Sequence, residues 1–317
     1  MKSPKKKIRA GLSLALTLAL AFLALSYVRA HWAEFHQLWS MPLPPWLWAA
    51  ILGVWALTLI ANSEVLRLGV TAQGASLGFG EGLALNMSTM AANYIIPLKG
   101  GAGLRAYYLS TRHQMPLTNF LSQLLAVSVH TLATGSLLAL VGLLSAAPSR
   151  GQGPLLAYFG GTFGLGLGSL LWLGRWPLQN HPRLANLARG WDVFRANPRL
   201  LARLTAWQLL YFGGLATVNR LCFGAFQIDL SWAQALFYSA GQIHSTIINL
   251  TPAGLGVVET FGILAGQILG FSPAEALMAQ GLYRLTQLTI LVSVGLWGWA
   301  RLRRVQLPQA VGLSDPE

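Results

Sequence analysis

Long apolar stretches recur along almost the whole of this chain, and they constrain its fold more than any other feature. They cover, approximately, residues 10–28, 46–63, 116–144, 155–173, 204–226 and 273–300. A helix needs about 20 apolar residues to cross the hydrocarbon core of a bilayer. Only 10% of the residues are charged, against roughly a quarter in soluble domains. We therefore predict an all-α polytopic membrane protein, with one transmembrane domain over residues 1–317.

The basic residues gather at alternate connections between these stretches. Those predicted to be cytoplasmic number sixteen: five in residues 1–9, Arg67, Arg112, six in residues 175–203 and three after residue 300. Arg29 and Arg150 lie on the outer side, and the remaining four lie at membrane depth. Cytoplasmic loops carry an excess of Lys and Arg. This bias predicts a protein of the bacterial cytoplasmic (inner) membrane with both termini in the cytoplasm.

The same bias defines three cytoplasmic regions and the partners that they suit. The regions are the basic N-terminus (1–9), a basic loop (174–203) and the C-terminal tail (301–317). The net charge of +13 suits anionic lipid head groups, which attract basic residues near the membrane surface. Because the basic residues flank apolar stretches, we expect a membrane lipid and no nucleic acid as partner.

Two further apolar units are interrupted by proline and glycine. The first runs from residue 81 to 111 and breaks at Pro97, Gly101 and Gly103. The second runs from 232 to 271 and breaks at Pro252, Gly254 and Gly256. Neither half of the first unit reaches the length of a full span. We interpret each unit as a re-entrant hairpin, with two short spans as the alternative, which makes about eight membrane segments in all.

The two broken units resemble each other within a longer repeat. Residues 77–83 parallel 230–236, and residues 116–121 parallel 273–277, with an offset that changes only from 153 to 157. The predicted topology gives the repeats, 79–145 and 230–300, opposite orientations. Inverted repeats with broken helices indicate the substrate site of a transporter. A chance resemblance is the alternative, because Pro and Gly are common in membrane helices.

Arg105 and Glu259 follow the two breaks at matching places. A charge near the bilayer centre costs several kcal/mol, so it faces a partner or a cavity. The two side chains either pair with each other or together bracket a polar head group. The planar fork of Arg suits phosphate. In the alternative interpretation they only hold the hairpins together.

Other polar residues near the breaks are weaker candidates. Arg284 is either a partner of Glu259 or part of the substrate site, and Lys99 either binds substrate or reaches the interface. The uncharged candidates for a polar path are Asn93, Asn249, Gln242, His244 and His130. No metal-ligand spacing or nucleophile motif accompanies them, and Cys222 is the only cysteine. We therefore expect neither a cofactor nor a metal, and no enzymatic activity.

The motifs at the breaks carry a family resemblance. Residues 93–109 show an N–P–G–R pattern through Asn93, Pro97, Gly101 and Arg105, and residues 252–259 read P-x-G-x-G-x-x-E. Residues 270–284 begin Gly-Phe-Ser-Pro-Ala-Glu-Ala and end Leu-Tyr-Arg. Together they resemble the flippase-like transmembrane domain of the lysylphosphatidylglycerol synthases, over roughly residues 8–304. The resemblance does not extend to the soluble aminoacyl-transfer domain of the full synthases, so we do not expect synthesis of an aminoacylated lipid.

The resemblance implies translocation of a lipid with a polar head, with Arg105 and Glu259 as the functional charges. We accordingly predict a flippase-like transporter for a polar- or phosphate-headed lipid, anionic or isoprenoid-linked, in cell-envelope biogenesis. One alternative is a non-catalytic accessory protein that scaffolds an envelope lipid or glycan biosynthesis enzyme. An intramembrane transferase is a third and less favoured hypothesis, since few acidic residues lie within the membrane. The sequence leaves the oligomeric state open.

Overall fold

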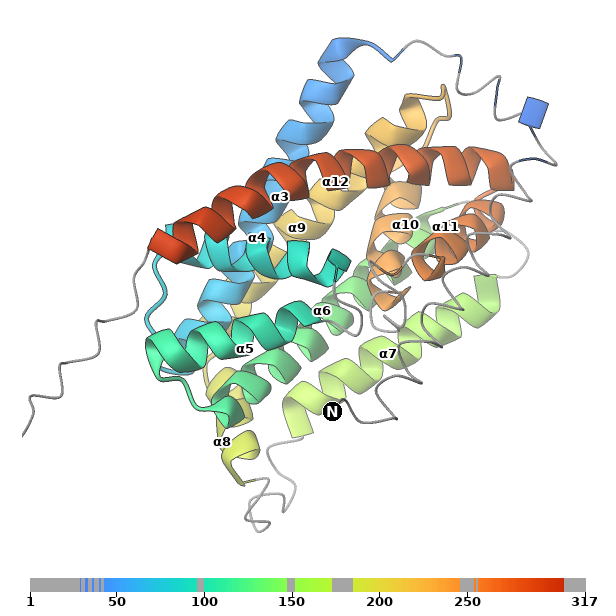
Figure 1. Ribbon diagram of the computed structural model, residues 1–317. Helices are drawn as coiled ribbons and strands as arrows, with labels where there is room; N and C mark the ends of the chain where they lie inside the picture. Colours follow the sequence, from blue (N-terminus) through green and yellow to red (C-terminus); the bar gives the residue numbers. More distant parts are fainter. Residues whose placement is uncertain are drawn as a thin grey trace, which may run out of the picture.

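The chain is helical throughout the residues that the structure describes. The computed structural model describes residues 29, 32–33, 36, 40, 43–95, 100–146, 152–172, 185–245, 254 and 256–304. These residues contain no strand. Their ten helices are α3 (Pro45–Ala72), α4 (Phe79–Ile95), α5 (Gly100–His113), α6 (Leu117–Ser145), α7 (Gln152–Trp172), α8 (Ala185–Arg195), α9 (Pro198–Gly224), α10 (Trp232–Ser245), α11 (Val257–Ile268) and α12 (Pro273–Arg304) (Figure 1). The predicted all-α class is confirmed, while the stretch at 10–28 lies outside the described residues.

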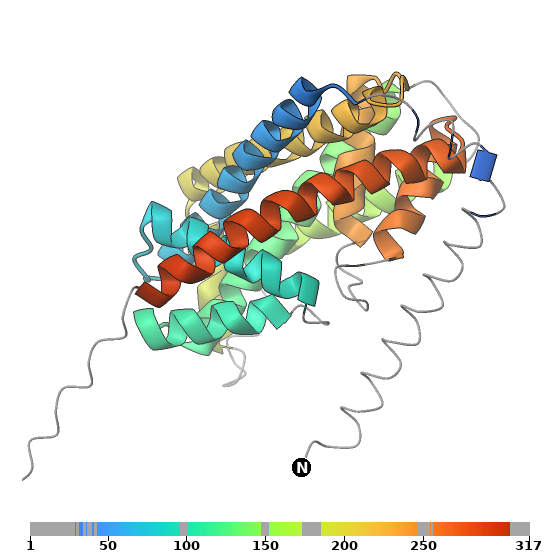
Figure 2. The ribbon, with the colours of Figure 1, turned by 45° about the horizontal axis from the view of Figure 1, so that its top comes forward.

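The long helices α3, α9 and α12 run side by side (Figure 2). Among the described helices, α3 and α6 are both long enough and apolar enough to span a membrane. The 21, 27 and 32 residues of α7, α9 and α12 also suffice in length, since about 20 are needed. Polar side chains in α9 and α12 lower the mean hydropathy of these two helices. The count of eight membrane segments therefore stays a prediction.

Helix α3 continues well past its predicted end near residue 63. It begins at Pro45, where a proline suits the first turn, and it ends at Ala72. The expected loop at Arg67 is therefore wrong. Arg67 lies within the helix and its Nη2 is 2.7 Å from Oε2 of Glu64. Side chains three apart in a helix are neighbours, so this pair neutralises the two charges within the helix.

The predicted basic loop at 174–203 is largely helical in its described part. Helix α8 occupies Ala185–Arg195, and α9 begins at Pro198, where the Asn197 side chain accepts a 2.9 Å hydrogen bond from the backbone N–H of Leu200. Trp191 and Phe194 of α8 are buried. Gln73 Nε2 donates a 2.8 Å hydrogen bond to the carbonyl of Gly190. The segment thus packs against the ends of α3 and α6.

Helices α4 and α5, the two halves of the first broken unit, form an antiparallel pair. At one end, Glu81 accepts hydrogen bonds from Tyr108 Oη at 2.6 Å and contacts His113 Nε2 at 2.9 Å. At the other end, Oδ1 of Asn93 accepts a 2.9 Å hydrogen bond from the backbone N–H of Gly101. Helices α4 and α5 therefore run in opposite directions, while residues 96–99 lie outside the described residues.

Helices α10 and α11, the two halves of the second broken unit, also pack antiparallel. A Cβ on Gly241 would lie 2.6 Å from Cζ of Phe261, and one on Gly262 would lie 2.7 Å from Oη of Tyr238. Absent side chains at both glycines allow the two helices to approach closely. Each broken unit is therefore a helical hairpin in its described residues.

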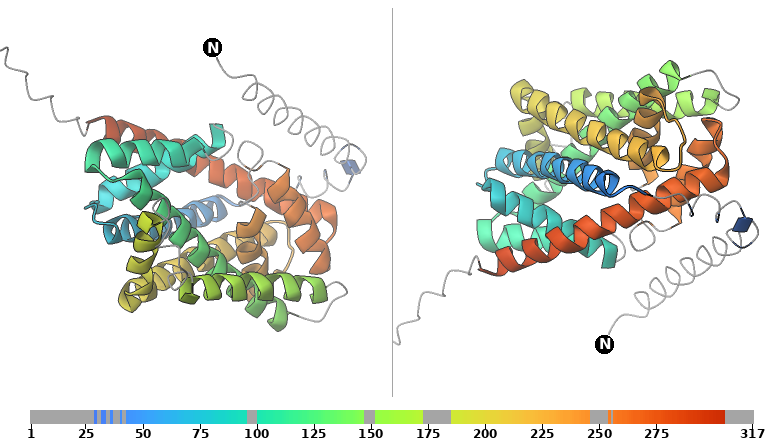
Figure 3. Two further views of the ribbon diagram at one scale, coloured as in Figure 1. Left: turned by 90° about the horizontal axis from the view of Figure 1, so that it is seen from below. Right: turned by 90° about the horizontal axis from the view of Figure 1, so that it is seen from above.

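Helix contacts recur in matching form in the two halves of the chain. Helices α3 and α9 are neighbours (Figure 3), α12 contacts α3, and α6 contacts α9. Helix α4 packs against α12, just as α10 packs against α6. A Cβ on Gly298 would lie 2.8 Å from the Ala84 carbonyl, and one on Gly142 would lie 2.6 Å from the Ala233 carbonyl. In both pairs a glycine of the long helix thus contacts the backbone of the first hairpin helix.

The interior is apolar with hydrogen-bonded polar groups, and the outer faces are apolar too. Trp55, Phe212 and Tyr238 are fully buried, and Trp55 Nε1 donates to Thr286 Oγ1 at 3.2 Å. Large side chains such as Leu296 remain 68% exposed. Apolar exposure on this scale is unusual for a soluble monomer and suits contact with lipid.

Candidate functional site

The start of α11 is shaped by Glu259 and two glycines. Gly254 and Gly256 have φ values of +67° and +84°, a left-handed conformation that glycine adopts without strain. The backbone N–H of Gly256 donates to Oε2 of Glu259 at 2.7 Å. The Thr260 hydroxyl donates to the Gly256 carbonyl at 2.6 Å. Glu259 therefore caps the helix that follows the second break, where a carboxylate is also favoured by the helix dipole.

Glu259 also forms an ion pair with Arg284 of α12. The Nε of Arg284 donates to Oε1 of Glu259 at 2.9 Å. The two side chains are only 14% (Arg284) and 20% (Glu259) exposed. A charge-assisted hydrogen bond between side chains that are so little exposed to solvent is stronger than an ion pair at the surface. The structure thus brings together two of the predicted site residues.

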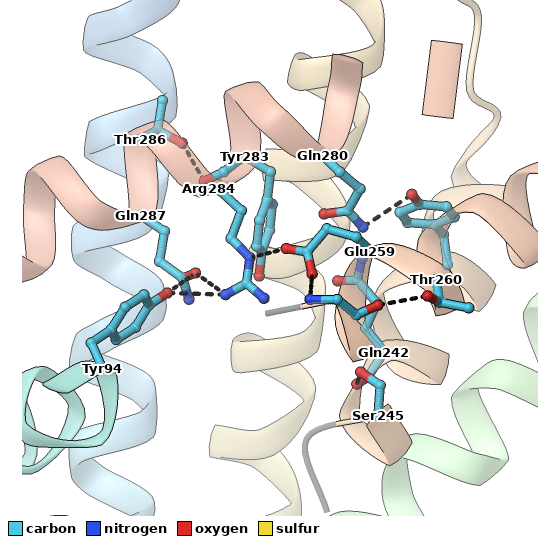
Figure 4. Close-up of polar contacts among 12 residues, drawn as sticks. Tyr94, Gln242, Ser245, Glu259, Thr260, Gln280, Tyr283, Arg284, Thr286 and Gln287 are labelled. Atoms are coloured by element: carbon cyan, nitrogen blue, oxygen red, sulfur yellow. Dashed lines mark hydrogen bonds and ion pairs between the residues drawn. The ribbon is translucent and has the colours of Figure 1, made fainter. Parts of the chain in front are cut away.

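The same guanidinium reaches the first broken unit. Its Nη1 donates to Oη of Tyr94 at 3.2 Å and lies 3.4 Å from Oε1 of Gln287, which also accepts a hydrogen bond from Tyr94 (Figure 4). Tyr94 is near the end of α4, just before the first break, and Glu259 is near the start of α11, just after the second. Arg284 therefore connects the segment just before the first break with the segment just after the second break.

Arg105 lies apart from this network and lacks a carboxylate partner. No ion pair among the described residues includes it. Its Nη2 is 3.4 Å from Oδ1 of Asn86 on α4, and its Nε is buried without a hydrogen-bond acceptor. The open alternative of an Arg105–Glu259 pair is therefore not observed, because α12 carries Arg284 to Glu259 while α5 directs Arg105 toward α4.

The other predicted residues divide into structural and undescribed ones. Asn93 joins the two helices of the first hairpin, and a Cβ on Gly101 would lie 2.2 Å from the Thr89 carbonyl. A Cβ on Gly103 would meet nothing within 4 Å, so packing does not exclude a larger residue at this position. The remaining predicted residues, which lie outside the described part of the chain, are Pro97, Lys99, Asn249 and Pro252.

Among the polar candidates farther from the breaks, the two histidines are hydrogen-bonded within the helix bundle. His130 Nε2 lies 3.0 Å from Thr205 Oγ1. The two ring nitrogens of His244 lie 3.1 Å from Ser136 Oγ and 3.1 Å from Tyr158 Oη. Gln242 is buried, and its Nε2 has no hydrogen-bond partner. In the part of the chain that the structure describes, no three His, Cys, Asp or Glu side chains are grouped to hold a metal ion.

Sequence reasoning missed Tyr94, Gln287 and Asn86. Gln287 lies three residues after Arg284, a spacing that places both on one face of a helix. Tyr94 is adjacent to Asn93 in the first motif, and its proximity to the break is the signal that could have identified it. Asn86 lies in the first half of the same unit, where it is one of several polar residues in an apolar segment.

The comparison with known families agrees with this geometry. Residues 12–295 match the family described as the lysylphosphatidylglycerol synthase TM region. The chain belongs to this family. The matched residues of this TM-region protein include both broken units and the network around Arg284. No curated protein and no solved structure matches the chain.

Proposed function

We propose that this TM-region protein translocates a lipid with a polar or phosphate-bearing head group between the leaflets of the bacterial cytoplasmic membrane. Arg105 is the observation that carries the proposal. Its Nε is buried without an acceptor, and no carboxylate among the described residues pairs with it. An unpaired charge at membrane depth costs several kcal/mol. A phosphate bound at Arg105 would supply the missing countercharge.

The arrangement of the helices supports a transporter built from two inverted repeats. Val65 and Leu68 of α3 share a buried cluster with Leu200 and Leu204, so the end of α3 lies beside the start of α9. The two helices are therefore antiparallel. If α9–α12 repeat α3–α6, each helix of the second half then runs opposite to its counterpart. Inverted repeats with broken helices place substrate sites at the repeat interface in many transporters.

The hairpins then have separate roles in the proposed mechanism. Each is re-entrant, and the breaks provide short helices within the membrane. Arg105 binds the phosphate of the head group as it leaves one leaflet. The Glu259–Arg284 ion pair holds the start of α11 against the end of α4, so that the polar path keeps its shape. The acyl chains remain in lipid, outside the helix bundle.

The proposed orientation follows from the charges at the two ends of the bundle. Arg303 stacks on Trp299 with its guanidinium carbon 5.0 Å from the ring centroid, at the end of α12. Arg220 stacks on Trp232 at 4.9 Å, near the end of α9. Trp and Arg are common at the head-group level. The end with most basic residues faces the cytoplasm in our proposal.

Replacing Arg105 by Ala tests the proposed function. Purified protein is placed in vesicles with an acyl-labelled phospholipid, and the label is quenched from outside to follow its movement. Removing a hydrogen bond to a charged group costs about 1.5–3 kcal/mol, so translocation should slow by about tenfold or more. The control is Arg220→Ala, which removes an arginine at a bundle end and should keep the wild-type rate.

Two outcomes would contradict the proposal. If Arg105→Ala inserts normally and moves lipid as fast as the wild type, Arg105 does not bind the head group. If the folded wild-type protein moves none of the phospholipids offered, the transporter assignment fails and the accessory role is favoured.

A further inference from the structure

Contacts between the described helices recur in two sets, one for each half of the chain. Helix α3 contacts α4, α6 and α12, while α9 contacts α10, α12 and α6. Likewise α12 contacts α4 and α11, while α6 contacts α10 and α5. The extensive contact of α7 with α6 has no counterpart among the described helices. Helix α7 precedes α9 in the chain, and the segment with the matching place before α3 is the apolar stretch 10–28, which lies outside the described residues.

Two glycines align the long helices α6 and α12 with each other. A Cβ on Gly135 of α6 would lie 3.5 Å from the Ala240 carbonyl of α10, and one on Gly295 of α12 would lie 3.8 Å from the Met87 carbonyl of α4. Ala240 and Met87 are separated by 153 positions, the offset at the start of the repeat. Gly135 and Gly295 therefore occupy equivalent places in the two halves.

The two long helices differ in burial where α7 crosses α6. A Cβ on Gly166 of α7 would lie 2.8 Å from Cβ of Ala133, which is 5% exposed. Ala133 lies two residues before Gly135, so the equivalent position on α12 is Ser293, which is exposed. Its neighbour Leu296 is 68% exposed. Helix α12 therefore presents an open face at the place where α6 is covered by α7.

The open face of α12 suits close contact with another helix. Thr289 and Ser293 place two small side chains on this face at a spacing of four. Their hydroxyls donate to the carbonyls of Leu285 and Thr289 at 2.9 and 2.8 Å, so both are satisfied within α12. Small residues at such a spacing let helices in a membrane approach closely.

The apolar stretch 10–28 fits this face in length and composition. Its 19 residues include no Asp, Glu, Lys or Arg, and about 20 apolar residues span a bilayer. Its small residues also recur at a spacing of four, at Gly11, Ala15 and Ala19. Residues 29–44 connect it to α3 and can extend over about 50 Å, which is ample because α3 contacts α12.

We infer that residues 10–28 form a membrane helix that packs on the open face of α12 as α7 packs on α6. In the second half, Phe159 of α7 contacts Phe237 of α10, with ring centroids 6.1 Å apart. The same arrangement brings the helix 10–28 beside α4, where it separates the first hairpin from lipid. This inference goes beyond lipid transport and does not depend on it.

Disulfide formation between the two helices tests the inference. Arg9 and Arg301 border the two apolar segments, at the cytoplasmic surface in our proposal. Ser293 lies eight residues before Arg301, and Thr17 lies eight residues after Arg9, which is about 12 Å for each at 1.5 Å per residue. Ser293→Cys is therefore combined with a single cysteine at each of residues 16–19, in the full chain with Cys222→Ala. These four positions cover one helical turn.

The expected result is an internal disulfide in at least one of the four pairs. Oxidation with copper phenanthroline in membranes should remove both thiols without changing the mass of the protein on a non-reducing gel, because a disulfide needs Cα atoms within about 7 Å. The matched control is Leu165→Cys of α7, which is 74% exposed on the opposite side of the bundle from α12 (Figure 3). It should form no disulfide with residues 16–19.

Three results would overturn the inference. A band of twice the mass in the Ser293→Cys pairs would show that a second copy covers α12. Absence of a disulfide at all four positions would show that the helix 10–28 lies elsewhere. Equal disulfide formation with Leu165→Cys would show that the contacts of this helix are unspecific.

A spin label on Ser293→Cys gives a second measurement that does not depend on the register of the two helices. Lipid-soluble oxygen should collide with this label less often than with the same label on Leu165→Cys, because a helix covers the former and lipid covers the latter. Equal or more frequent collisions at Ser293→Cys would show that α12 faces lipid there and would overturn the inference.

Discussion

At the scale of single residues, Glu259 links the start of α11 to α12, because it contacts both Gly256 and Arg284, which lies 25 positions later in the sequence. It caps α11 through Gly256 and neutralises Arg284 on α12. Removing one member of such a pair leaves the other charge with little solvent, whereas removing both avoids that penalty. The two residues should therefore be strongly coupled in stability.

A double-mutant cycle measures this coupling. Arg284→Met should lower the free energy of unfolding by about 2–3 kcal/mol, because Glu259 is left without its countercharge. Adding Glu259→Gln, which retains an oxygen for the Gly256 N–H, should recover part of that loss. Thermal unfolding in detergent gives both values, and strictly additive effects would show that the ion pair does not act as a unit.

The sequence predicted the members of this site better than their contacts. Arg105, Glu259 and Arg284 stood out because charges are rare at membrane depth. Which arginine reaches Glu259 depends on how α5 and α12 pack, and no local pattern encodes that choice. Tyr94 and Gln287 were missed because uncharged polar residues are common in membrane helices that bond to one another.

At the scale of helices, glycines decide which surfaces approach each other. Gly101 brings α5 against the Thr89 carbonyl of α4, and Gly142 and Gly298 bring long helices against hairpin backbones. The spacing of four between Gly160, Gly164 and Gly168 is typical of a close-packed helix ridge, but the structure differs. A Cβ at these three would meet nothing within 4 Å among the described residues, whereas one on Gly166 would lie 2.8 Å from Cβ of Ala133.

Two glycines of the same helix provide a matched test. Gly101→Ala should destabilise the protein by about 1–3 kcal/mol, because the new methyl group must displace α5 from the Thr89 carbonyl. Gly103→Ala has open space and should be neutral or stabilising by up to about 1 kcal/mol, since Ala favours a helix over Gly. Thermal unfolding distinguishes them, and equal destabilisation by both would contradict the close contact at Gly101.

At the scale of the whole molecule, the helix order and the two hairpins were accessible from the apolar pattern and its breaks. The boundaries were less so: α3 runs nine residues beyond residue 63 because Glu64 and Arg67 neutralise each other within the helix. Helix α8 was missed because its segment is basic and short, and it is the packing of Trp191 and Phe194 that holds it to the bundle. The local apolar pattern therefore indicates long apolar helices well and short basic helices poorly.

The proposed orientation makes a prediction that needs only chemical labelling. Cys222 is buried, so Cys222→Ala gives a background without cysteine. In that background Ser110→Cys, near the end of α5, should react with an impermeant maleimide only from the cytoplasmic side. Asp229→Cys, whose native side chain is 94% exposed, should react only from the opposite side. Labelling of both positions from one side would contradict the orientation.

The position of Arg284 has a mechanical consequence. The guanidinium group of Arg284 binds Tyr94 in the final turn of α4 and Glu259 in the first turn of α11, and thereby acts as a common tether for these two segments. A ligand that competes for this tether would loosen both segments together, because it binds the state in which the tether is released. The two hairpins would then move in concert on ligand arrival, without a separate signal passing from one to the other.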